Sequence, residues 1–416
     1  MWDTRAGRER VLHGMSVALH LAFSPSGDLL ASRGRDGATR LWDLNTDRIV
    51  LETSAGLEKG FGRAGHRLAF EKETVGVGVW EVVGSSAYRT IRAPAARLEP
   101  VEQVTFSPDG RWLLWSGVDG LSWMNPASGQ TGHQPAKMTY SAHFQPDGQA
   151  LLTSGWEGVR RWAVPPGTNG AADTLRFEPP AMLLAQDPDI LKGLRWSSLS
   201  SDGQLIAAAG QDWVGTLGTN GVPVAFRQSN DLGAISVALD AAGRWFAYGT
   251  EVDGCRVADA RTGILVKTLN LSAAAVLFDP KGRWLATGTV NDYALWETGS
   301  WNLVRRHHRD VALRRSGVMA FSADGSLWAV AHSTDLVRLF DAASGVELVT
   351  LTPPSRLLVQ SLAFSPDGAR LAVGSENAVV QLWDLPALRR ELAKLGLDWK
   401  TNVQGAALSS PGRSSL

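Results

Sequence analysis

The chain has 416 residues, 44% of them hydrophobic, and its 41 basic and 41 acidic side chains give a formal net charge of zero. This length exceeds one ordinary compact domain unless the domain is built from repeats, and the balanced charge does not indicate a chain-wide attraction to nucleic acid or anionic membrane. The single cysteine, Cys255, excludes an internal disulfide, and neither a run of the ~18 apolar residues needed to cross a bilayer nor an N-terminal leader is visible. We therefore expect no membrane partner and a cytoplasmic location.

Two short strands joined by a turn are predicted over the first twelve residues. A repeating unit then begins at Phe23, which is followed by the turn Ser24-Pro25-Ser26-Gly27 and by a run that ends in Trp42-Asp43. In such a turn Pro presets φ and Gly accepts a positive φ, while Ser or Asp bonds the local backbone. The flanking runs are short and rich in Val and Leu, which predicts antiparallel strands.

The unit recurs along almost the whole chain. The apolar residues that precede the nine predicted turns are Phe23, Phe61, Phe106, Phe144, Leu199, Leu239, Phe278, Phe321 and Phe364. Most of them lie 38 to 45 residues apart, and an interval of 55 after Phe144 accommodates an extra Gly/Pro/Asn loop over 165–180. A fourth, outer strand follows the third, as at Glu347–Leu351. A period near 40 residues with four strands per unit is the pattern of a β-propeller blade.

These units resemble the WD40-repeat family over residues 1–385. The resemblance implies an all-β propeller of about nine four-stranded units in which the third-strand residues fill the space between blades. These structural positions are Trp42, Asp43, Trp80, Trp123, Trp162, Trp296, Phe340, Asp341, Trp383 and Asp384. Trp112, Trp245 and Trp284, at the start of second strands, are interpreted as packing residues as well. The acid before the third strand is usually kept but the family's Gly-His pair is mostly absent, so we expect its hydrogen-bond network to be partial.

The N-terminal segment suggests how the propeller closes. Residues 2–9 align with residues 340–347, so residues 9–12 are predicted to supply the outer strand of the last unit, which hides two sheet edges. Nine units can form one wide ring, or seven blades with two left over from a truncated second propeller. We favour the single ring.

A helix is predicted in the segment 386–398, where Pro386 stands near the start, leucines follow and Gly396 ends it. Its apolar stripe either packs on the propeller rim or docks a partner. Residues 399–416 are Ser- and Gly-rich and are predicted to be flexible. The run LRRELAKLGLDW resembles the end of WD40 regions in large bacterial proteins with an upstream Ser/Thr kinase domain.

Residues that could carry chemistry have a structural explanation in each case. His307-His308-Arg309-Asp310 contains the kinase triplet His-Arg-Asp, but the kinase pattern needs Asn at position 315, which is Arg. No metal-ligand spacing is present, and Cys255 is expected to be a small buried apolar residue. A basic run, Arg305, Arg306, Arg309, Arg314 and Arg315, is interpreted as a solvated loop, with nucleic-acid or acidic-peptide contact as the alternative.

The expected function is a non-enzymatic interaction platform that binds a protein or peptide partner, without a cofactor, a catalytic site or nucleic acid. One alternative is the truncated sensor or scaffold region of a kinase-linked protein. Another is a propeller enzyme whose site lies at the channel mouth. The partner, the binding face and the oligomeric state stay open.

Overall fold

The computed structural model describes most of the chain. The described residues are 2–3, 8–9, 12, 18–35, 37–44, 48–53, 57–63, 67–72, 76–81, 87–92, 99–165, 175–184, 194–210, 213–228, 233–251, 254–271, 273–309, 316–353, 357–376 and 378–399. Within them every element is a strand except one helix. The predicted all-β class with a short C-terminal helix is confirmed. The predicted tail beyond residue 399 lies outside the described residues.

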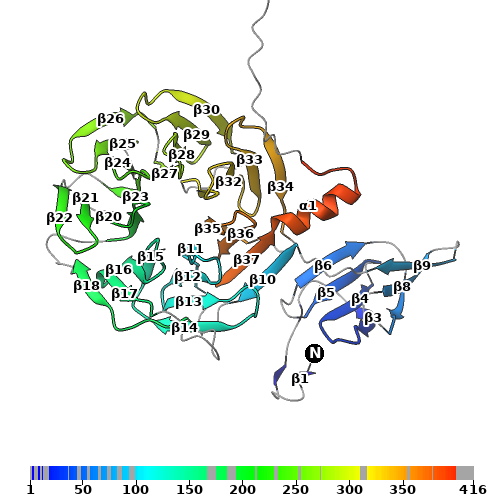
Figure 1. The fold of residues 1–416 in the computed structure, drawn as a ribbon. Helices are drawn as coiled ribbons and strands as arrows, with labels where there is room; N and C mark the ends of the chain where they lie inside the picture. The colour runs from blue at the N-terminus through cyan, green and yellow to red at the C-terminus, as the bar shows by residue number, and fades with distance from the viewer. Residues whose placement is uncertain are drawn as a thin grey trace, which may run out of the picture.

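Seven four-stranded antiparallel sheets stand around a ring (Figure 1). Blade 1 consists of Gln103–Phe106, Leu113–Gly117, Gly120–Met124 and Thr131–Pro135 (β11–β14). Blade 2 consists of Thr139–Phe144, Ala150–Gly155, Gly158–Ala163 and Ala181–Leu184 (β15–β18). Blade 3 consists of Trp196–Leu199, Leu205–Ala209, Trp213–Gly218 and Pro223–Gln228 (β19–β22). Blade 4 consists of Ala234–Leu239, Trp245–Thr250, Cys255–Asp259 and Leu265–Leu269 (β23–β26). Blade 5 consists of Ala275–Phe278, Trp284–Gly288, Asp292–Glu297 and Leu303–His308 (β27–β30). Blade 6 consists of Met319–Phe321, Leu327–Ala331, Val337–Asp341 and Glu347–Leu351 (β31–β34). Blade 7 is Val359–Phe364, Arg370–Ser375 and Val379–Asp384 (β35–β37) together with Tyr88–Arg92 (β10).

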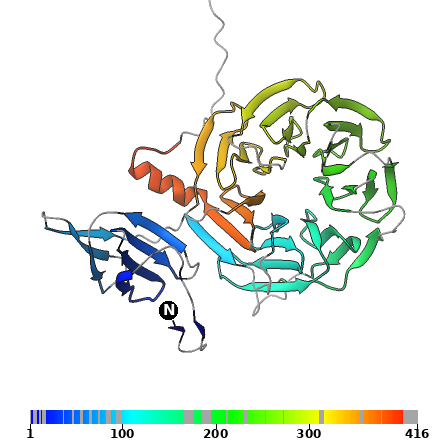
Figure 2. The same cartoon turned by 180° about the vertical axis from the view of Figure 1, so that it is seen from behind.

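Two further sheets lie beside the ring in both views (Figures 1 and 2). They consist of Ala18–Phe23, Leu29–Gly34, Thr39–Asp43 and Arg48–Thr53 (β3–β6), and of Leu57–Phe61, Arg67–Lys72 and Gly76–Glu81 (β7–β9). We call β3–β9 the two-blade unit. A hairpin of Trp2–Asp3 (β1) and Arg8–Glu9 (β2) precedes it. Each of the nine predicted units therefore corresponds to one sheet, but the preference for a single nine-blade ring was wrong.

The ring is closed by β10, and not by the N-terminal segment as predicted. Tyr88 pairs with Trp383 and Arg92 with Val379 along β37, and the amide of Asp384 donates to the carbonyl of Ala87 at 2.8 Å. In chain order β10 follows β9, where a fourth, outer strand of the second sheet of the two-blade unit would be expected. Instead it pairs with the last blade, and this pairing protects an edge that would otherwise be open.

The apolar core of the ring lies between blades. The second strand of blade 2, β16, is buried on both faces, whereas the outer strand β14 of blade 1 alternates between exposed and half-buried residues. Blade 6 and blade 7 share one buried cluster that includes Leu339, Leu362, Phe364 and Trp383. Because each blade covers the next in this way, every blade needs a neighbour on both faces.

Side chains of the innermost strands bridge successive blades. The inner strands of neighbouring blades are in separate sheets and do not pair. A polar side chain on one inner strand instead accepts a hydrogen bond from the backbone of the next. Among the described residues, bonds of this kind join Val104 N to Ser361 Oγ (3.0 Å), Ala142 N to Gln103 Oε1 (2.8 Å), Leu239 N to Ser198 Oγ (3.0 Å) and Val276 N to Ser236 Oγ (3.1 Å). They satisfy backbone groups that would otherwise lack a partner.

The predicted helix is present as Leu385–Lys394 (α1). Asp384 ends β37 and also caps the helix, because its Oδ1 accepts from the amide of Ala387 at 2.8 Å. Leu385 is buried in the cluster between blades 6 and 7, and Leu388 packs against it. Leu395 is exposed. The helix therefore packs part of its apolar stripe on the ring, as the first of the two alternatives predicted.

Candidate functional site

The antiparallel order of the strands gives the ring two different faces. The turns between first and second strands, such as Ser365–Gly368, lie at one end of the strands, which we call the turn face. The turns between second and third strands, such as Trp156-Glu157, lie at the other end, together with the connections that enter the inner strands. We call this second end the loop face.

Acidic side chains on the turn face are used inside their own turns. Ser365 Oγ donates to Asp367 Oδ1 at 2.5 Å and accepts from the amide of Arg370 at 2.8 Å, while the same Asp367 oxygen accepts from the amide of Ala369. Gly368 has a φ of 67°, which a residue with a Cβ rarely adopts. The Ser365 hydroxyl lowers the pKa of Asp367, and Ser200 lowers that of Asp202 in the same way. These carboxylates are committed to turn structure.

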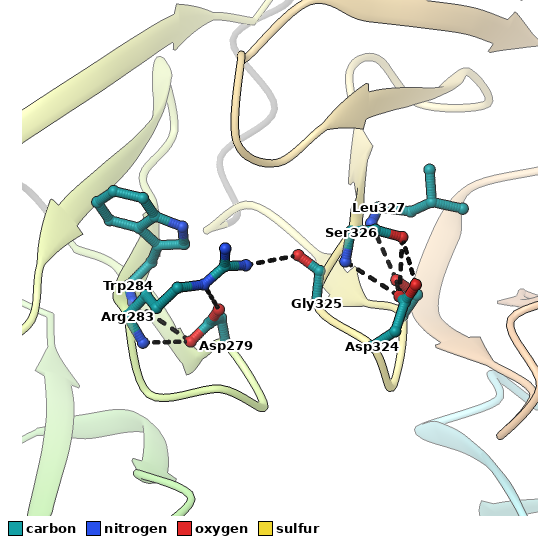
Figure 3. Close-up of polar contacts among 8 residues, drawn as sticks. Asp279, Arg283, Trp284, Asp324, Gly325, Ser326 and Leu327 are labelled. Carbon is teal, nitrogen blue, oxygen red and sulfur yellow. Dashed lines mark hydrogen bonds and ion pairs between the residues drawn. The ribbon is translucent and has the colours of Figure 1, made fainter. Parts of the chain in front are cut away.

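Blade 5 carries a buried carboxylate at the first turn position. Asp279 is fully buried, and its Oδ1 accepts from the amides of Arg283 (2.6 Å) and Trp284 (3.3 Å). Its Oδ2 lies 3.1 Å from Arg283 Nε, and Arg283 Nη2 donates to the carbonyl of Gly325 in blade 6 at 2.9 Å (Figure 3). Both oxygens therefore have partners, and the arrangement ties two neighbouring turns together rather than presenting a free acid.

The loop face carries an exposed aromatic cluster. Trp156 follows the second strand of blade 2 and is 58% exposed. Its Nε1 donates to the hydroxyl of Tyr140 on the inner strand of the same blade at 3.2 Å. The guanidinium of Arg195, just before the inner strand of blade 3, lies 5.9 Å from the centroid of the Tyr140 ring. These three residues, which we call the Trp156 cluster, join two blades at one face.

The charges around the Trp156 cluster are unequal. Glu157 Oε2 accepts from Arg160 Nη1 at 2.9 Å and from the amide of Lys137 at 3.2 Å. Lys137 and Arg195 are exposed, and no described carboxylate forms an ion pair with either. The loop face thus carries two cations in the neighbourhood of the exposed Trp156. An acidic side chain next to an apolar one fits these groups.

A comparison with known families decides the nature of the repeats. A family described as "WD domain, G-beta repeat" matches residues 9–43 and 345–384. The chain carries WD40 repeats. The segment 345–384 begins before the outer strand of blade 6 and ends at the third strand of blade 7, so this WD40 sequence repeat is staggered relative to the blade. This stagger is why an early strand can complete the last blade.

Pre-mRNA-processing factor 19 of Caenorhabditis elegans is 38% identical to this chain over 79 residues. The alignment covers 18% of this chain and 14% of that protein, so the chain spans only a small part of the relative's length. WD40 repeats are typical of protein-interaction scaffolds without catalytic activity. The resemblance of the C-terminal run to kinase-linked bacterial proteins stays a prediction.

The structure places most of the predicted WD40 positions inside the sheets. Trp42, Trp123, Trp162, Phe340 and Trp383 are buried and Trp296 is half-buried, while the Trp80 side chain lies outside the described residues. Their acidic neighbours Asp43, Asp341 and Asp384 are half-buried. Asp341 accepts from the amide of Ser344 at 2.6 Å and so closes the next turn. Their role as packing residues stays a prediction that substitution can test.

The WD40 hydrogen-bond network is present only in part. In the part of the chain that the structure describes, three tryptophans donate Nε1 to a hydroxyl on the second strand of their own sheet: Trp42 to Ser32 (2.6 Å), Trp162 to Thr153 (2.9 Å) and Trp296 to Thr287 (3.0 Å). His133, of the pair Gly132-His133, lies in the outer strand β14, and its Nδ1 lies 3.0 Å from Ser122 Oγ. The contact between His133 and Ser122 is therefore separate from the hydrogen bonds of the three tryptophans.

The other candidate residues are dispersed in the WD40 ring. In β30 the His307 ring lies 4.3 Å from that of Phe340, whereas His308 Nδ1 lies 2.5 Å from Asp292 Oδ1, so the two histidines contact different partners. Arg305 donates to the carbonyl of Ala343, and Arg309 donates to that of Thr289 at 2.7 Å. Asp310, Arg314 and Arg315 lie outside the described residues. Cys255 is fully buried in β25, and burial raises the pKa of its thiol to about 12.

Within the described ranges no group of three His, Cys, Asp or Glu side chains could hold a metal ion. No helix in the same part of the chain is long and apolar enough to span a bilayer. The sequence interpretation overlooked Trp156. A signal was present, because Gly155-Trp156-Glu157-Gly158 places a large aromatic residue in a turn between two glycines, where solvent exposure is expected.

Proposed function

We propose that this chain is a non-enzymatic scaffold that binds a protein segment at the Trp156 cluster on the loop face. The single observation that supports the proposal is the exposure of Trp156, 58%, in a ring whose other described tryptophans are buried or half-buried. Trp, Tyr and Arg are the residue types that contribute most binding energy at protein interfaces. Here Trp156 bonds Tyr140 and Arg195 lies over the Tyr140 ring, at the ends of two adjacent blades.

The chemistry of the cluster specifies the ligand. The indole of Trp156 offers an apolar surface, and Arg195 and Lys137 offer cations that no described carboxylate neutralises. A peptide with an aromatic or aliphatic side chain adjacent to Asp or Glu satisfies both. On the turn face the acids of turns such as Ser365–Gly368 already accept hydrogen bonds from their own turns.

The proposal is tested by peptide selection. A displayed random-peptide library is selected on the full chain, and the recovered peptides are titrated by fluorescence polarisation. We expect acidic-apolar motifs whose dissociation constant rises at least about tenfold on Trp156→Ala, the loss of an interface hot spot. Val346→Ala is the matched control, because Val346 is also 58% exposed but lies on the turn face.

The salt dependence of peptide binding distinguishes the contribution of the cation from that of the indole. Arg195→Ala should weaken binding and reduce its sensitivity to ionic strength, because it removes a charge at the cluster. Peptides that bind the Trp156→Ala variant as tightly as the unmodified chain would refute the site. Tight binding of single-stranded oligonucleotides that depends on Trp156 would refute the ligand class instead.

A further inference from the structure

Four apolar side chains of the two-blade unit are strongly exposed. Leu21 and Phe23 on β3 are 58% and 54% exposed, and Val77 and Val79 on β9 are 73% and 60% exposed. They form two groups, one on the first sheet and one on the second. Exposed apolar groups of this kind on strands mark a surface that a partner covers.

The first group has direct counterparts inside the ring. β3 pairs with β4 in the register in which β35 pairs with β36, including a bulge at the same place, so Leu21 corresponds to Leu362 and Phe23 to Phe364. Leu362 and Phe364 are 7% and 9% exposed because blade 6 covers them. The face that carries Leu21 and Phe23 is therefore the face on which a preceding blade sits.

The second group is matched in the same way. Val77 pairs with Glu71 and Val79 with Ala69, just as Val337 pairs with Ala331 and Leu339 with Ala329 in blade 6. Val337 and Leu339 are 2% and 0% exposed, since blade 7 follows them. The face that carries Val77 and Val79 is therefore the face on which a following blade sits.

These two faces are the two halves of one kind of interface. In the ring, Val337 and Leu339 belong to the same buried cluster as Leu362 and Phe364. The two-blade unit thus exposes both complementary surfaces at once. Leu12 packs against Leu30 and Trp42, so the chain itself covers the part of the first sheet around Trp42 and leaves the inner strand with Leu21 and Phe23 open.

We propose that two copies of this chain associate head to tail through their two-blade units, with the Val77–Val79 face of one copy on the Leu21–Phe23 face of the other. The occupant is a second copy because one chain presents both halves of the interface. Such a contact is heterologous, so each dimer keeps one open face of each kind and can add further copies until a ring closes.

Two variants with opposite defects test the proposal. Phe23→Glu places a charge on one face and Val79→Glu places a charge on the other. We expect the mass of the unmodified chain in sedimentation velocity to rise with concentration above the 44.6 kDa of one copy. Each variant alone should stay at that mass. An equimolar mixture should form a one-to-one dimer and nothing larger, because each variant keeps one intact face.

The mixture distinguishes this geometry from unspecific association. Both substituted positions are more than half exposed, and circular dichroism verifies that the variants fold. Val346→Glu, on the turn face of the ring, is the control and should assemble like the unmodified chain. The proposal is overturned if the unmodified chain stays monomeric at all concentrations, if the mixed variants stay monomeric, or if Val346→Glu abolishes assembly.

Discussion

The buried tryptophan Trp162 has apolar neighbours around its ring system and a hydrogen-bond acceptor for its indole N–H. Trp162 is 4% exposed and fills the space between blades, but its indole N–H needs an acceptor, which Thr153 supplies at 2.9 Å. A buried donor without a partner costs more than the bond itself contributes. Thr153 on the second strand therefore supports the burial of Trp162 on the third.

Replacing Thr153 by Val tests this dependence. The two side chains have similar shape, but Val leaves Trp162 Nε1 without its acceptor, so we expect the free energy of unfolding to fall by about 1–3 kcal/mol. Trp162→Phe removes the donor, and the double variant should lose less than the two single losses added together. Urea denaturation followed by circular dichroism measures each value. Thr268→Val, on an exposed outer-strand position, is the control with little expected change.

The carboxylate of Asp367 makes the turn sensitive to acid. The Ser365 hydroxyl lowers the pKa of this carboxyl in the folded chain. A folded-state pKa below the unfolded value of about 3.9 means that the contribution is present above that pH and is lost as the pH falls through the folded pKa.

We therefore expect the difference in denaturation midpoint between the unmodified chain and Asp367→Asn to shrink between about pH 4 and pH 2.5. Thermal melts across that range measure it. Ser365→Ala removes the principal cause of the shift, so the acid dependence should be weaker in that background. A midpoint difference that stays constant down to pH 2.5 would contradict the assignment.

Among the elements, β10 decides whether the ring is closed. It pairs along five positions with β37, places Ile91 in the cluster between blades 1 and 7, and brings the Tyr88 ring to 4.7 Å from that of Trp383. Without it, β37 would present an unpaired edge and the apolar residues of blade 7 would lose cover. One strand of five residues thus connects the two ends of a seven-blade ring.

A pair of truncations isolates this strand. Residues 87–399 contain every strand of the ring, whereas residues 93–399 lack β10 and differ by only six residues. We expect the longer chain to unfold cooperatively and the shorter one to unfold at lower temperature and to aggregate through the open edge. Differential scanning calorimetry and light scattering compare the two. Equal stability of both truncations would show that β10 is not the closing element.

At the scale of the whole molecule, the nine units divide into a closed ring and an open pair of blades. In the ring every blade has a neighbour on each side, whereas the two-blade unit has neither a preceding nor a following blade on its outer faces. The same kind of residue is consequently buried in one place and exposed in the other, as Leu362 and Leu21 illustrate.

The rate at which Cys255 is labelled measures whether the ring is closed. Its side chain is fully buried between blades 4 and 5, and burial raises its pKa to about 12, so a thiol reagent at pH 8 reaches it only when the ring opens. We expect equally slow labelling in the full chain and in residues 87–399, and faster labelling in residues 93–399. Mass spectrometry of the labelled chain measures the rates. Rapid labelling of the full chain under native conditions would contradict a closed, packed ring.

The sequence by itself determined what depends on neighbouring residues. The Ser-Pro-Asp-Gly turns, the short strands around them, the Trp-Asp ends and the capped helix follow from local backbone chemistry, and all nine units and the helix were predicted. Only the tertiary structure decided which strand closes the ring, because Tyr88–Arg92 has no pattern that distinguishes it from other outer strands and its partner lies nearly 300 residues away. It also decided that seven blades close and two stay open, and that Trp156 is exposed while Trp162 is buried. These outcomes depend on how blades stack around an axis, and no local pattern of residues encodes that geometry.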